Sequence, residues 1–548
     1  MLIHRIADQL ASAAEFRDIE RNLATAQDAT LGIAQSARPL AIAALYARNP
    51  RPCVVVVAGE DAAQRMAQAL ASYVGLDQVE RIPLRCDLPW SDKPSDDAVV
   101  GARCRALARL KAGEPCLAVA SARALLRCVP PVGSDYFMPI SFEIGQEIDF
   151  ATVPEKLLFL GYTSQGAVDG PGTFHVHGDL VDVWPAQSTG PVRLEFFGDE
   201  IDAIRTLVPS TGQTIGQVTD VEMYPARELA LSPKAIERCR RKLYQASQDD
   251  DELARHMEMF SQGIVFHEAD RYLSSLYAST TGPLAHVAPE VLMVLAEPRS
   301  LFDDATRYYD EVSVLARNAK VSLEGLYLKP AQMDFGSQQR LTLVSIMRAG
   351  GGATSELRVQ QPDVAGGARL VRRLDSLRHM GYATVFAIPD SEARRAMKIT
   401  LTDEHIPIVA SLATSTENRG ACIPEWARVS HEPLPRGPIT VTDAPIPAGV
   451  VIPDARLAVI SSADLQSRMA KHGRRKNIDV TDITFPFKPG DYVVHATHGI
   501  AHFTAIVRKE VAGKERDYFQ LEYAGADKLF VPFEQVDRLT RYVGPDSD

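Results

Sequence analysis

The chain has 548 residues, 46% of them hydrophobic and 24% charged, and its formal net charge is −11 at pH 7. This length allows about three to five domains, and the hydrophobic share is sufficient for well-packed cores. The negative charge argues against a protein that binds nucleic acid over its whole surface, because phosphate binding needs a concentrated basic face.

The seven cysteines include no C-x-x-C pair, and several lie beside apolar residues that favour strands. This pattern predicts reduced, buried thiols in a cytoplasmic protein. No apolar run approaches the roughly 18 residues of a membrane span, and Asp8, Glu15 and Asp18 argue against a signal peptide. We therefore expect no contact with a membrane.

Residues 1–134 alternate predicted helices and strands, which is the pattern of an α/β domain. Cys53–Ala58 and Cys116–Ala120 are continuous apolar runs, as expected for parallel strands covered on both faces, and Asp61–Tyr73 has helical spacing. A phosphate-binding loop needs Gly-x-x-x-x-Gly-Lys-Ser/Thr, and the nearest candidate, Leu31–Ala37, lacks the second glycine and the lysine. We expect this domain to bind no nucleotide.

Residues 135–226 change to the pattern of antiparallel strands. Phe174–Pro185 and Pro191–Asp202 each predict a strand, a turn and a second strand, with alternation that suits a half-buried sheet. Residues 227–330 are mostly helical in pattern, and Ser232-Pro233 predicts the start of one helix.

Residues 338–460 predict another α/β unit, with a strand at Ala383–Ile388 and a helix start at Pro389-Asp390-Ser391. The segment 461–487 then predicts a basic helical linker. A basic cluster can contact DNA, but on such a linker it is more often a solvated face, which is the interpretation we favour. Its cations are Arg468, Lys471, Arg474, Arg475 and Lys476.

Residues 488–548 predict four or five short strands separated by turns, including a hairpin turn at Ala512-Gly513-Lys514. Phe519, Leu521 and Tyr523 alternate with polar residues and share one face. So few residues can bury a core only by curling into a small SH3/Tudor-like β-barrel. Eight basic side chains balance eight acidic ones between positions 488 and 544, which favours an edge strand that pairs with another protein over a phosphate-binding surface.

The sequence gives little support for a catalytic or metal-binding site. His495, His498 and His502 have no cysteine or carboxylate at ligand spacing, so turn and core roles are favoured over zinc binding. No Ser-His-Asp or Cys-His arrangement and no pair of carboxylates has a local signature. We predict no catalytic residue, no metal and no cofactor in this chain.

Three blocks near the C-terminus resemble the RNA-polymerase-interacting module of bacterial transcription-repair coupling factors, which CarD-type regulators share. These blocks are residues 489–495, 498–500 and 527–532. The resemblance implies that the polymerase β subunit binds along the second strand of the barrel. The strand residues implied are Ile506, Val507, Arg508, Lys509 and Glu510. Family members commonly carry an apolar residue near Lys509; a lysine suits an acidic partner strand, but edge strands also carry lysine to prevent aggregation.

Residues 135–226 resemble the UvrA-docking domain that UvrB shares with the coupling factors, around Gly178, Asp182 and the block 193–201. The resemblance implies contacts with UvrA through His177, Arg193 and Phe197. The family usually has arginine in place of His177, and histidine cannot form a bidentate fork to a carboxylate, so we expect weaker binding. The competing interpretation makes Arg193 a solvated sheet residue and Phe197 a core residue.

The block 92–107 makes residues 1–134 similar to the degenerate RecA-like first domain shared with UvrB. This resemblance implies that residues 227–330 return to that domain, and that residues 338–460 match a third domain of obscure role. The resemblance stops where two ATP-hydrolysing motor domains would begin. Full-length members are ATP-dependent DNA translocases, so we expect ATP, magnesium and DNA contacts only through that motor, and the chain is either a fragment or a motorless relative.

Our first hypothesis is therefore a non-catalytic adaptor in transcription-coupled nucleotide excision repair, which binds RNA polymerase through the barrel and UvrA through the UvrB-like domain. The alternative is a CarD-like transcription regulator that has lost repair coupling. A working ATPase is disfavoured by the missing phosphate-binding loop, although the sequence leaves open whether the protein is an enzyme.

Overall fold

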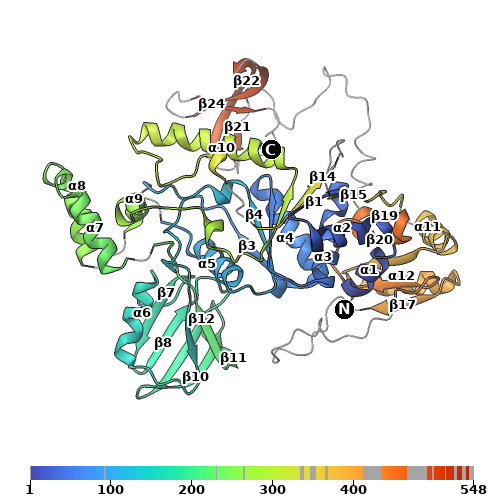
Figure 1. The fold of residues 1–548 in the computed structure, drawn as a ribbon, viewed down its shortest axis with the longest axis horizontal. Coiled ribbons are helices and arrows are strands. Elements are labelled where there is room, and N and C mark those ends of the chain that lie inside the picture. Colours follow the sequence, from blue (N-terminus) through green and yellow to red (C-terminus); the bar gives the residue numbers. More distant parts are fainter. Residues whose placement is uncertain are drawn as a thin grey trace. The chain divides into compact units, whose positions relative to one another are not determined.

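The computed structural model describes most of the chain (Figure 1). The described residues are 2–91, 94–229, 231–262, 266–333, 338–345, 353–364, 368–411, 433–465, 490, 492–495, 499–511, 514–523, 528–532 and 539–541. They divide into two units, Met1–Arg468 and Met469–Asp548, and each is described by itself. The helices are α1 (Leu2–Leu10), α2 (Ala14–Thr25), α3 (Arg38–Arg48), α4 (Glu60–Val74), α5 (Asp97–Lys111), α6 (Val153–Phe159), α7 (Pro233–Leu243), α8 (Asp251–Ser261), α9 (Leu273–Leu276), α10 (Pro298–Asn318), α11 (Ala368–His379) and α12 (Ser391–Asp403).

Seven parallel strands form the first sheet, in the order β15-β1-β14-β13-β2-β4-β3. The strands are β1 (Asp28–Gly32), β2 (Cys53–Val57), β3 (Val79–Ile82), β4 (Leu117–Ser121), β13 (Leu292–Ala296), β14 (Arg340–Val344) and β15 (Ala353–Glu356). Every residue of β2, β4 and β13 is buried, because helices cover both faces of a parallel sheet. The two apolar runs are therefore confirmed as buried strands, with bounds of 53–57 and 117–121; Ala58 lies past the end of β2 and is half-buried.

Strands β14 and β15 differ from the expectation, because residues 340–356 were assigned to the unit 338–460. They flank β1 in the first sheet instead, and β14 also pairs with β13. The alternating sequence of β14 and the mostly polar sequence of β15 would suit either sheet, so only the tertiary pairing decides where they belong. Some strands that pair in the first sheet are thus more than 300 residues apart in the sequence, as the pairing of Asp28 with Arg340 shows.

The six-stranded sheet is inserted between β4 and the helices that return to the first sheet, and its order is β11-β10-β9-β8-β7-β6. Its strands are β6 (Thr163–Ser164), β7 (Thr173–His177), β8 (Leu180–Trp184), β9 (Val192–Phe197), β10 (Glu200–Leu207) and β11 (Thr214–Val218), beside the pair β5 (Ile140–Glu143) and β12 (Asp220–Met223). Gly178 and Gly198 occupy the β7–β8 and β9–β10 turns with φ of 63° and 64°, a backbone region that favours glycine. The two predicted strand–turn–strand segments are confirmed.

The second parallel sheet has the order β17-β18-β16-β20-β19, in which only β19 is antiparallel. Its strands are β16 (Ala383–Ala387), β17 (Ile408–Ser411), β18 (Ile439–Thr442), β19 (Val450–Ile452) and β20 (Leu457–Ser461). Helices α11 and α12 cover one face, where Leu374 and Leu401 join the buried cluster of Phe386. The predicted helix start is confirmed, because the Asp390 carboxylate caps α12 by accepting the Ala393 N–H at 2.7 Å.

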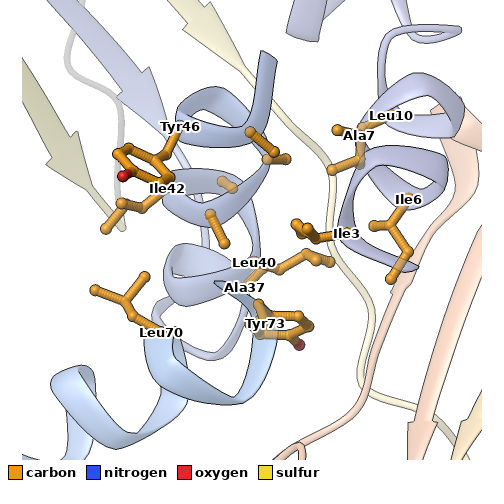
Figure 2. Packing of buried hydrophobic residues seen from close by; sticks show 14 of the residues in the cluster. Ile3, Ile6, Ala7, Leu10, Ala37, Leu40, Ile42, Tyr46, Leu70 and Tyr73 are labelled. Carbon is orange, nitrogen blue, oxygen red and sulfur yellow. The ribbon is translucent and has the colours of Figure 1, made fainter. Parts of the chain in front are cut away.

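Helix α1 is shared by the two parallel sheets. Ile6 lies in the same buried cluster as Tyr73 of α4, and Figure 2 shows α1 facing α3 and α4. That cluster also contains Val459 of the second sheet, and the Gln9 amide donates to the Ala455 carbonyl oxygen at 2.6 Å. One short helix therefore completes the cores of two sheets.

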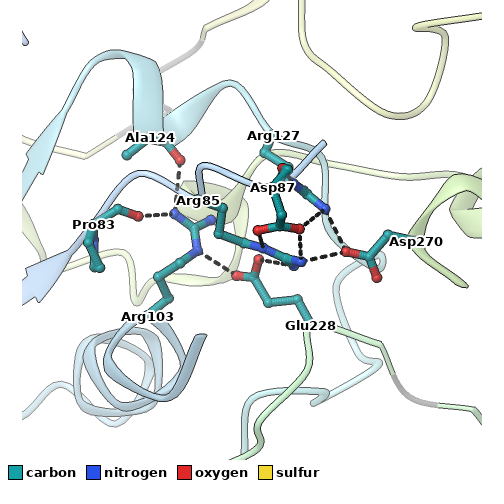
Figure 3. A network of polar contacts seen from close by, with 8 residues as sticks. All are labelled: Pro83, Arg85, Asp87, Arg103, Ala124, Arg127, Glu228 and Asp270. Atoms are coloured by element: carbon teal, nitrogen blue, oxygen red, sulfur yellow. Dashed lines mark hydrogen bonds and ion pairs between the residues drawn. The ribbon is translucent and has the colours of Figure 1, made fainter. Parts of the chain in front are cut away.

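A buried network of ion pairs joins the first sheet to the chain that leaves the six-stranded sheet (Figure 3). Arg85 contacts Asp87 at 2.6 Å, Glu228 at 3.1 Å and Asp270 at 2.8 Å. Arg103, which is fully buried, donates to Glu228 at 2.8 Å. Burial alone would raise the pKa of Asp87, but the charges of its arginine neighbours outweigh it and lower that pKa to about 2. The carboxylates are thus held ionised by the guanidinium groups.

The network also includes the ion pair of Arg127 with Asp270 and two backbone carbonyl oxygens. Arg127 donates to Asp270 at 2.6 Å, and Arg103 donates to the carbonyl oxygens of Pro83 at 2.9 Å and Ala124 at 3.1 Å. Burial would also raise the pKa of Glu228, but the charges of Arg103 and Arg85 lower it. Three cations and three carboxylates therefore compensate one another in the interior.

The C-terminal sheet has five antiparallel strands in the order β24-β23-β22-β21-β25. They are β21 (Tyr492–His495), β22 (Gly499–Val511), β23 (Lys514–Glu522), β24 (Lys528–Pro532) and β25 (Leu539–Arg541). Phe519 and Leu521 are buried and Tyr523 packs against their cluster, as the shared face predicts. Since β24 and β25 stand at the two ends of this order, closure into a barrel stays a prediction.

Five of the cysteines are buried free thiols, namely Cys53, Cys104, Cys116, Cys128 and Cys239. Cys86 is exposed, and Cys422 lies outside the described residues. Burial raises the pKa of the Cys53 and Cys116 thiols to about 12, so these groups stay protonated and act as small apolar side chains. Within the described ranges, no helix is both long and apolar enough to cross a membrane.

The buried network predicts a large effect of Glu228→Gln. The change removes one anion and leaves the guanidinium groups of Arg85 and Arg103 undercompensated, which costs about 3–5 kcal/mol of the free energy of unfolding. Amide hydrogen exchange of β2, measured by mass spectrometry, should accelerate by at least about a hundredfold, and on the order of several thousandfold at the larger loss, at pH 7. Because the pKa of Asp87 is lowered, the stabilisation is complete above about pH 4 and lost towards pH 2.

The matched control is Asp28→Asn, which removes the exposed partner of Arg340. An exposed pair contributes less than about 1 kcal/mol, so exchange of β2 should change by less than roughly fivefold. Equal exchange rates in Glu228→Gln and the unmodified protein would contradict the structural role of the network.

Candidate functional site

The outer face of the six-stranded sheet carries polar side chains on three neighbouring strands. Along β9, Leu194 and Phe196 are buried, while Arg193 and Phe197 point to the opposite side. The register places Arg193 opposite Asp182 of β8. Opposite charges on directly facing positions stabilise a sheet, so this face is organised around that pair.

Arg193 is held by a bidentate ion pair with Asp182. The guanidinium Nε donates to Oδ1 at 2.7 Å and Nη2 donates to Oδ2 at 2.8 Å. Burial alone would raise the pKa of Asp182, but the hydrogen bonds from Arg193 and His177 outweigh it and lower that pKa. The hydrogen bond to Asp182 likewise raises the pKa of Arg193. The cation is therefore fixed in one orientation while part of its guanidinium group stays at the surface.

His177 is the second partner of the same carboxylate. Its Nε2 lies 3.2 Å from Oδ2 of Asp182, and its ring stacks on that of His175 with centroids 5.2 Å apart. The Nδ1 atom of His175 lies 2.8 Å from the carbonyl oxygen of Gln165, which orients the stacked pair. The structure thus brings two of the three expected UvrA-contacting residues onto one carboxylate.

Phe197 is the third expected residue, and it lies at the end of β9, beside the turn between β9 and β10. Its side chain is 83% exposed, so the interpretation of Phe197 as a core residue is wrong. The neighbouring Phe196 donates its N–H to the Asp179 carbonyl oxygen at 3.0 Å, which places Phe197 near the β7–β8 turn that follows His177. An exposed aromatic ring on the same strand face as a fixed cation is typical of a protein-binding surface.

Asp182 is the residue that sequence reasoning missed as part of the site. It matched the family block but was given no role of its own. The signal was present, because Asp182 and Arg193 occupy outward positions of two predicted strands joined by one connection. Opposite charges at such positions pair when the register brings them together, and the register is fixed by the buried Val181 and Leu194 on the inner face.

The second expected surface is the strand β22, which carries residues 506–510. β22 pairs with β23 from His502 to Val511, whereas β21 pairs with it only from Gly499 to His502. Among the described residues, the far edge of β22 beyond His502 therefore has no neighbouring strand. Val507 is half-buried, and the side chains of Ile506, Arg508, Lys509 and Glu510 lie outside the described residues. This open edge has the backbone geometry that strand addition requires.

A cavity of about 830 Å³ lies at the carboxyl ends of β2 and β13, where open α/β sheets commonly bind ligands. Its wall includes Arg38, at the start of the helix that follows the loop Leu31–Ala37. Arg38 forms an ion pair with Glu297 and donates to the Ser345 hydroxyl at 2.8 Å. This guanidinium group is engaged within the protein, and the expectation that no nucleotide binds here stays a prediction.

Of the three histidines considered as metal ligands near the C-terminus, only His502 has a side chain among the described residues. The ring of His502 packs against Tyr492 with centroids 5.3 Å apart, while His498 and the side chain of His495 lie outside the described residues. No group of three or more His, Cys, Asp or Glu side chains in the described part of the chain is arranged to hold a metal ion. The expectation of no metal site stays a prediction.

Two stretches of the chain match known families. Residues 140–229 match the "UvrB interaction domain", and residues 487–543 match the "CarD-like/TRCF RID domain". The first stretch contains the face with Arg193 and Phe197, and the second contains β22. The chain therefore combines a UvrB interaction domain with a CarD-like RNA-polymerase-interacting domain, on a multidomain α/β framework.

The chain is also related to transcription-repair-coupling factors along almost its whole length, as its motifs indicated. The factor of Bacillus subtilis (strain 168) is 24% identical over 551 residues, that of Myxococcus xanthus 26% over 559, and that of Mycobacterium tuberculosis (strain CDC 1551 / Oshkosh) 28% over 577. These matches cover 94%, 94% and 97% of this chain, but only 45%, 46% and 46% of the relatives. The chain thus spans less than half the length of the curated relatives it matches.

The paired face predicts how Asp182 titrates. Because Arg193 supplies two hydrogen bonds to the carboxylate, the protonation midpoint of Asp182 should lie below the ordinary 3.8, and Arg193→Lys should move it upward. Carbon-detected NMR of the aspartate carboxyl groups measures this midpoint. Arg205→Lys, which changes the neighbouring pair with Glu195, should leave it close to that of the unmodified protein. An unchanged midpoint in Arg193→Lys would contradict the assigned pairing.

Proposed function

We propose that this chain is a non-catalytic adaptor of transcription-coupled nucleotide excision repair. In this proposal the outer face of the six-stranded sheet binds UvrA and the open edge of β22 binds the RNA polymerase β subunit. The names of the two matched domains and of the relatives support both partners. The observation that carries the proposal is the 83% exposure of Phe197 on the same face of β9 as the fixed Arg193.

The chemistry of the outer face suits a protein partner. Arg193 is pre-oriented by Asp182, so little side-chain entropy is lost when it meets a partner carboxylate or carbonyl group. Phe197 supplies apolar surface that is removed from water when the partner binds. His177 is shorter than the arginine usual in the family and already contacts Asp182, so it adds a weaker contact. We therefore propose UvrA binding that depends mainly on Arg193 and Phe197.

The chemistry of β22 suits a partner strand. Backbone N–H and C=O groups on an unpaired edge can continue the sheet with a strand from another protein, and the side chains then select the partner. In this proposal Lys509 favours an acidic partner strand. The alternative function is a CarD-like regulator, in which β22 binds polymerase and the six-stranded sheet has no repair partner.

Phe197→Ala tests the UvrA surface. Truncating an aromatic anchor at an interface centre typically costs about 2 kcal/mol or more, so affinity for purified UvrA should fall at least about thirtyfold in calorimetry. Ile215→Ala is the matched control, because Ile215 is also an exposed apolar residue of this sheet at 66% exposure. Absence of UvrA binding by the unmodified chain would favour the regulator, and equal losses in both variants would contradict a specific role of Phe197.

Removal of residues 485–548 tests the polymerase surface. The truncated chain should lose binding to the isolated polymerase β subunit, since the proposed edge strand is gone, while its affinity for UvrA should be unchanged. Pull-down with each partner separately measures both effects. Phe197→Ala serves as the reciprocal control and should retain polymerase binding. Polymerase binding that survives the truncation would overturn this half of the proposal.

A further inference from the structure

An uncompensated group of arginines lies at one edge of the second parallel sheet. Helix α11 leads directly into β16, so its first turns lie at the carboxyl edge of that strand, and α12 begins at the same edge. Both helices cover one face of the sheet, because Leu374 and Leu401 share a buried cluster. Five cations lie in the first two turns of these helices, namely Arg369, Arg372, Arg373, Arg394 and Arg395.

These arginines differ from those of the first sheet in having no counter-charge. Arg85, Arg103 and Arg127 are each paired with carboxylates. By contrast, none of the five at the sheet edge forms an ion pair with a described residue; Arg369 and Arg395 are exposed. The chain as a whole carries a net charge of −11, so this group is a local concentration of positive charge on an acidic protein.

Hydrogen bonds hold part of the group in place. Nη1 of Arg394 donates to the carbonyl oxygens of Ile388 at 2.7 Å and Pro389 at 2.9 Å, which fixes it at the end of β16. Nε of Arg372 donates to the Ala368 carbonyl oxygen at 3.2 Å. Both guanidinium groups keep further N–H donors for an external acceptor. Each of the two helices thus presents one arginine whose position is held by a hydrogen bond to the backbone.

The position of these cations is electrostatically unfavourable for the helices themselves. Positive charge in the first turn of a helix opposes the helix dipole, and Arg369 and Arg394 lie in such first turns. The nearby carboxylate of Asp390 is used to cap α12, and Glu392 is the one acidic residue in the first turn of that helix. The repulsion among the arginines and with the dipoles is relieved when a polyanion binds.

We propose that these five arginines bind the phosphate backbone of nucleic acid. Guanidinium groups match phosphate oxygens in geometry, and several of them on one edge give sequence-independent binding to a duplex. This activity is separate from the proposed UvrA and polymerase surfaces. It gives the second parallel sheet, whose role the sequence leaves open, a function as a non-specific DNA contact.

The experiment measures fluorescence anisotropy of a short labelled DNA duplex with the full chain, between about 50 and 200 mM salt. The unmodified chain should bind with a dissociation constant in the range of about 10⁻⁴ to 10⁻⁶ M at the lower salt. Arg372→Glu/Arg395→Glu should weaken binding at least about tenfold and reduce the slope of log affinity against log salt by about two. Arg372→Gln/Arg395→Gln should show the same direction with a smaller loss.

Arg240→Glu/Arg241→Glu on α7 is the matched control. These two arginines are also exposed and form no ion pair with a described residue, and the change in net charge is identical. The control should bind DNA almost as the unmodified chain does. The proposal would be overturned if both charge-reversed proteins lost DNA affinity equally, or if the unmodified chain did not bind DNA at about 50 mM salt. Tighter binding of poly-glutamate than of DNA would also overturn it.

Discussion

The structure depends on the buried network of Arg85, Arg103 and Glu228 with its neighbouring ion pairs. Burial of isolated charges is costly, so each guanidinium group must meet a carboxylate or a carbonyl oxygen. The required partners come from three distant parts of the chain, and Glu228 follows β12, the strand after the last one of the six-stranded sheet. These ion pairs therefore fix the position at which the inserted sheet is attached to the first sheet.

The outer face of the six-stranded sheet is also organised by an ion pair between a carboxylate and a guanidinium group. Asp182 accepts two hydrogen bonds from Arg193 and lies within reach of His177, so a single carboxylate organises the polar part of the face. Phe197 adds the apolar part and is supported by the glycine turn at position 198. The inner face of the sheet fixes the register, and the register brings the outward side chains together.

Local patterns predicted much of the secondary structure, because the fully buried strands at 53–57 and 117–121 and the alternating strands around Phe197 have distinct periodicities. The sequence also predicted His177, Arg193 and Phe197 as neighbours on one domain, through resemblance. It did not predict Asp182 as their organiser, since cross-strand register follows from tertiary packing. Nor did it place β14 and β15 in the first sheet, because the sequence of a short strand carries no information about which distant strand it joins.

The position of β1 has a consequence for the order of folding during synthesis. Its neighbours β14 and β15 leave the ribosome more than 300 residues later, as the register of Asp28 with Arg340 shows. Contacts so distant in sequence must wait for the chain to lengthen, and they slow folding. The six-stranded sheet is continuous in sequence and can form first. A nascent chain of this protein therefore carries a finished six-stranded sheet beside an incomplete first sheet, and β1 cannot pair with β14 and β15 until residue 356 has emerged.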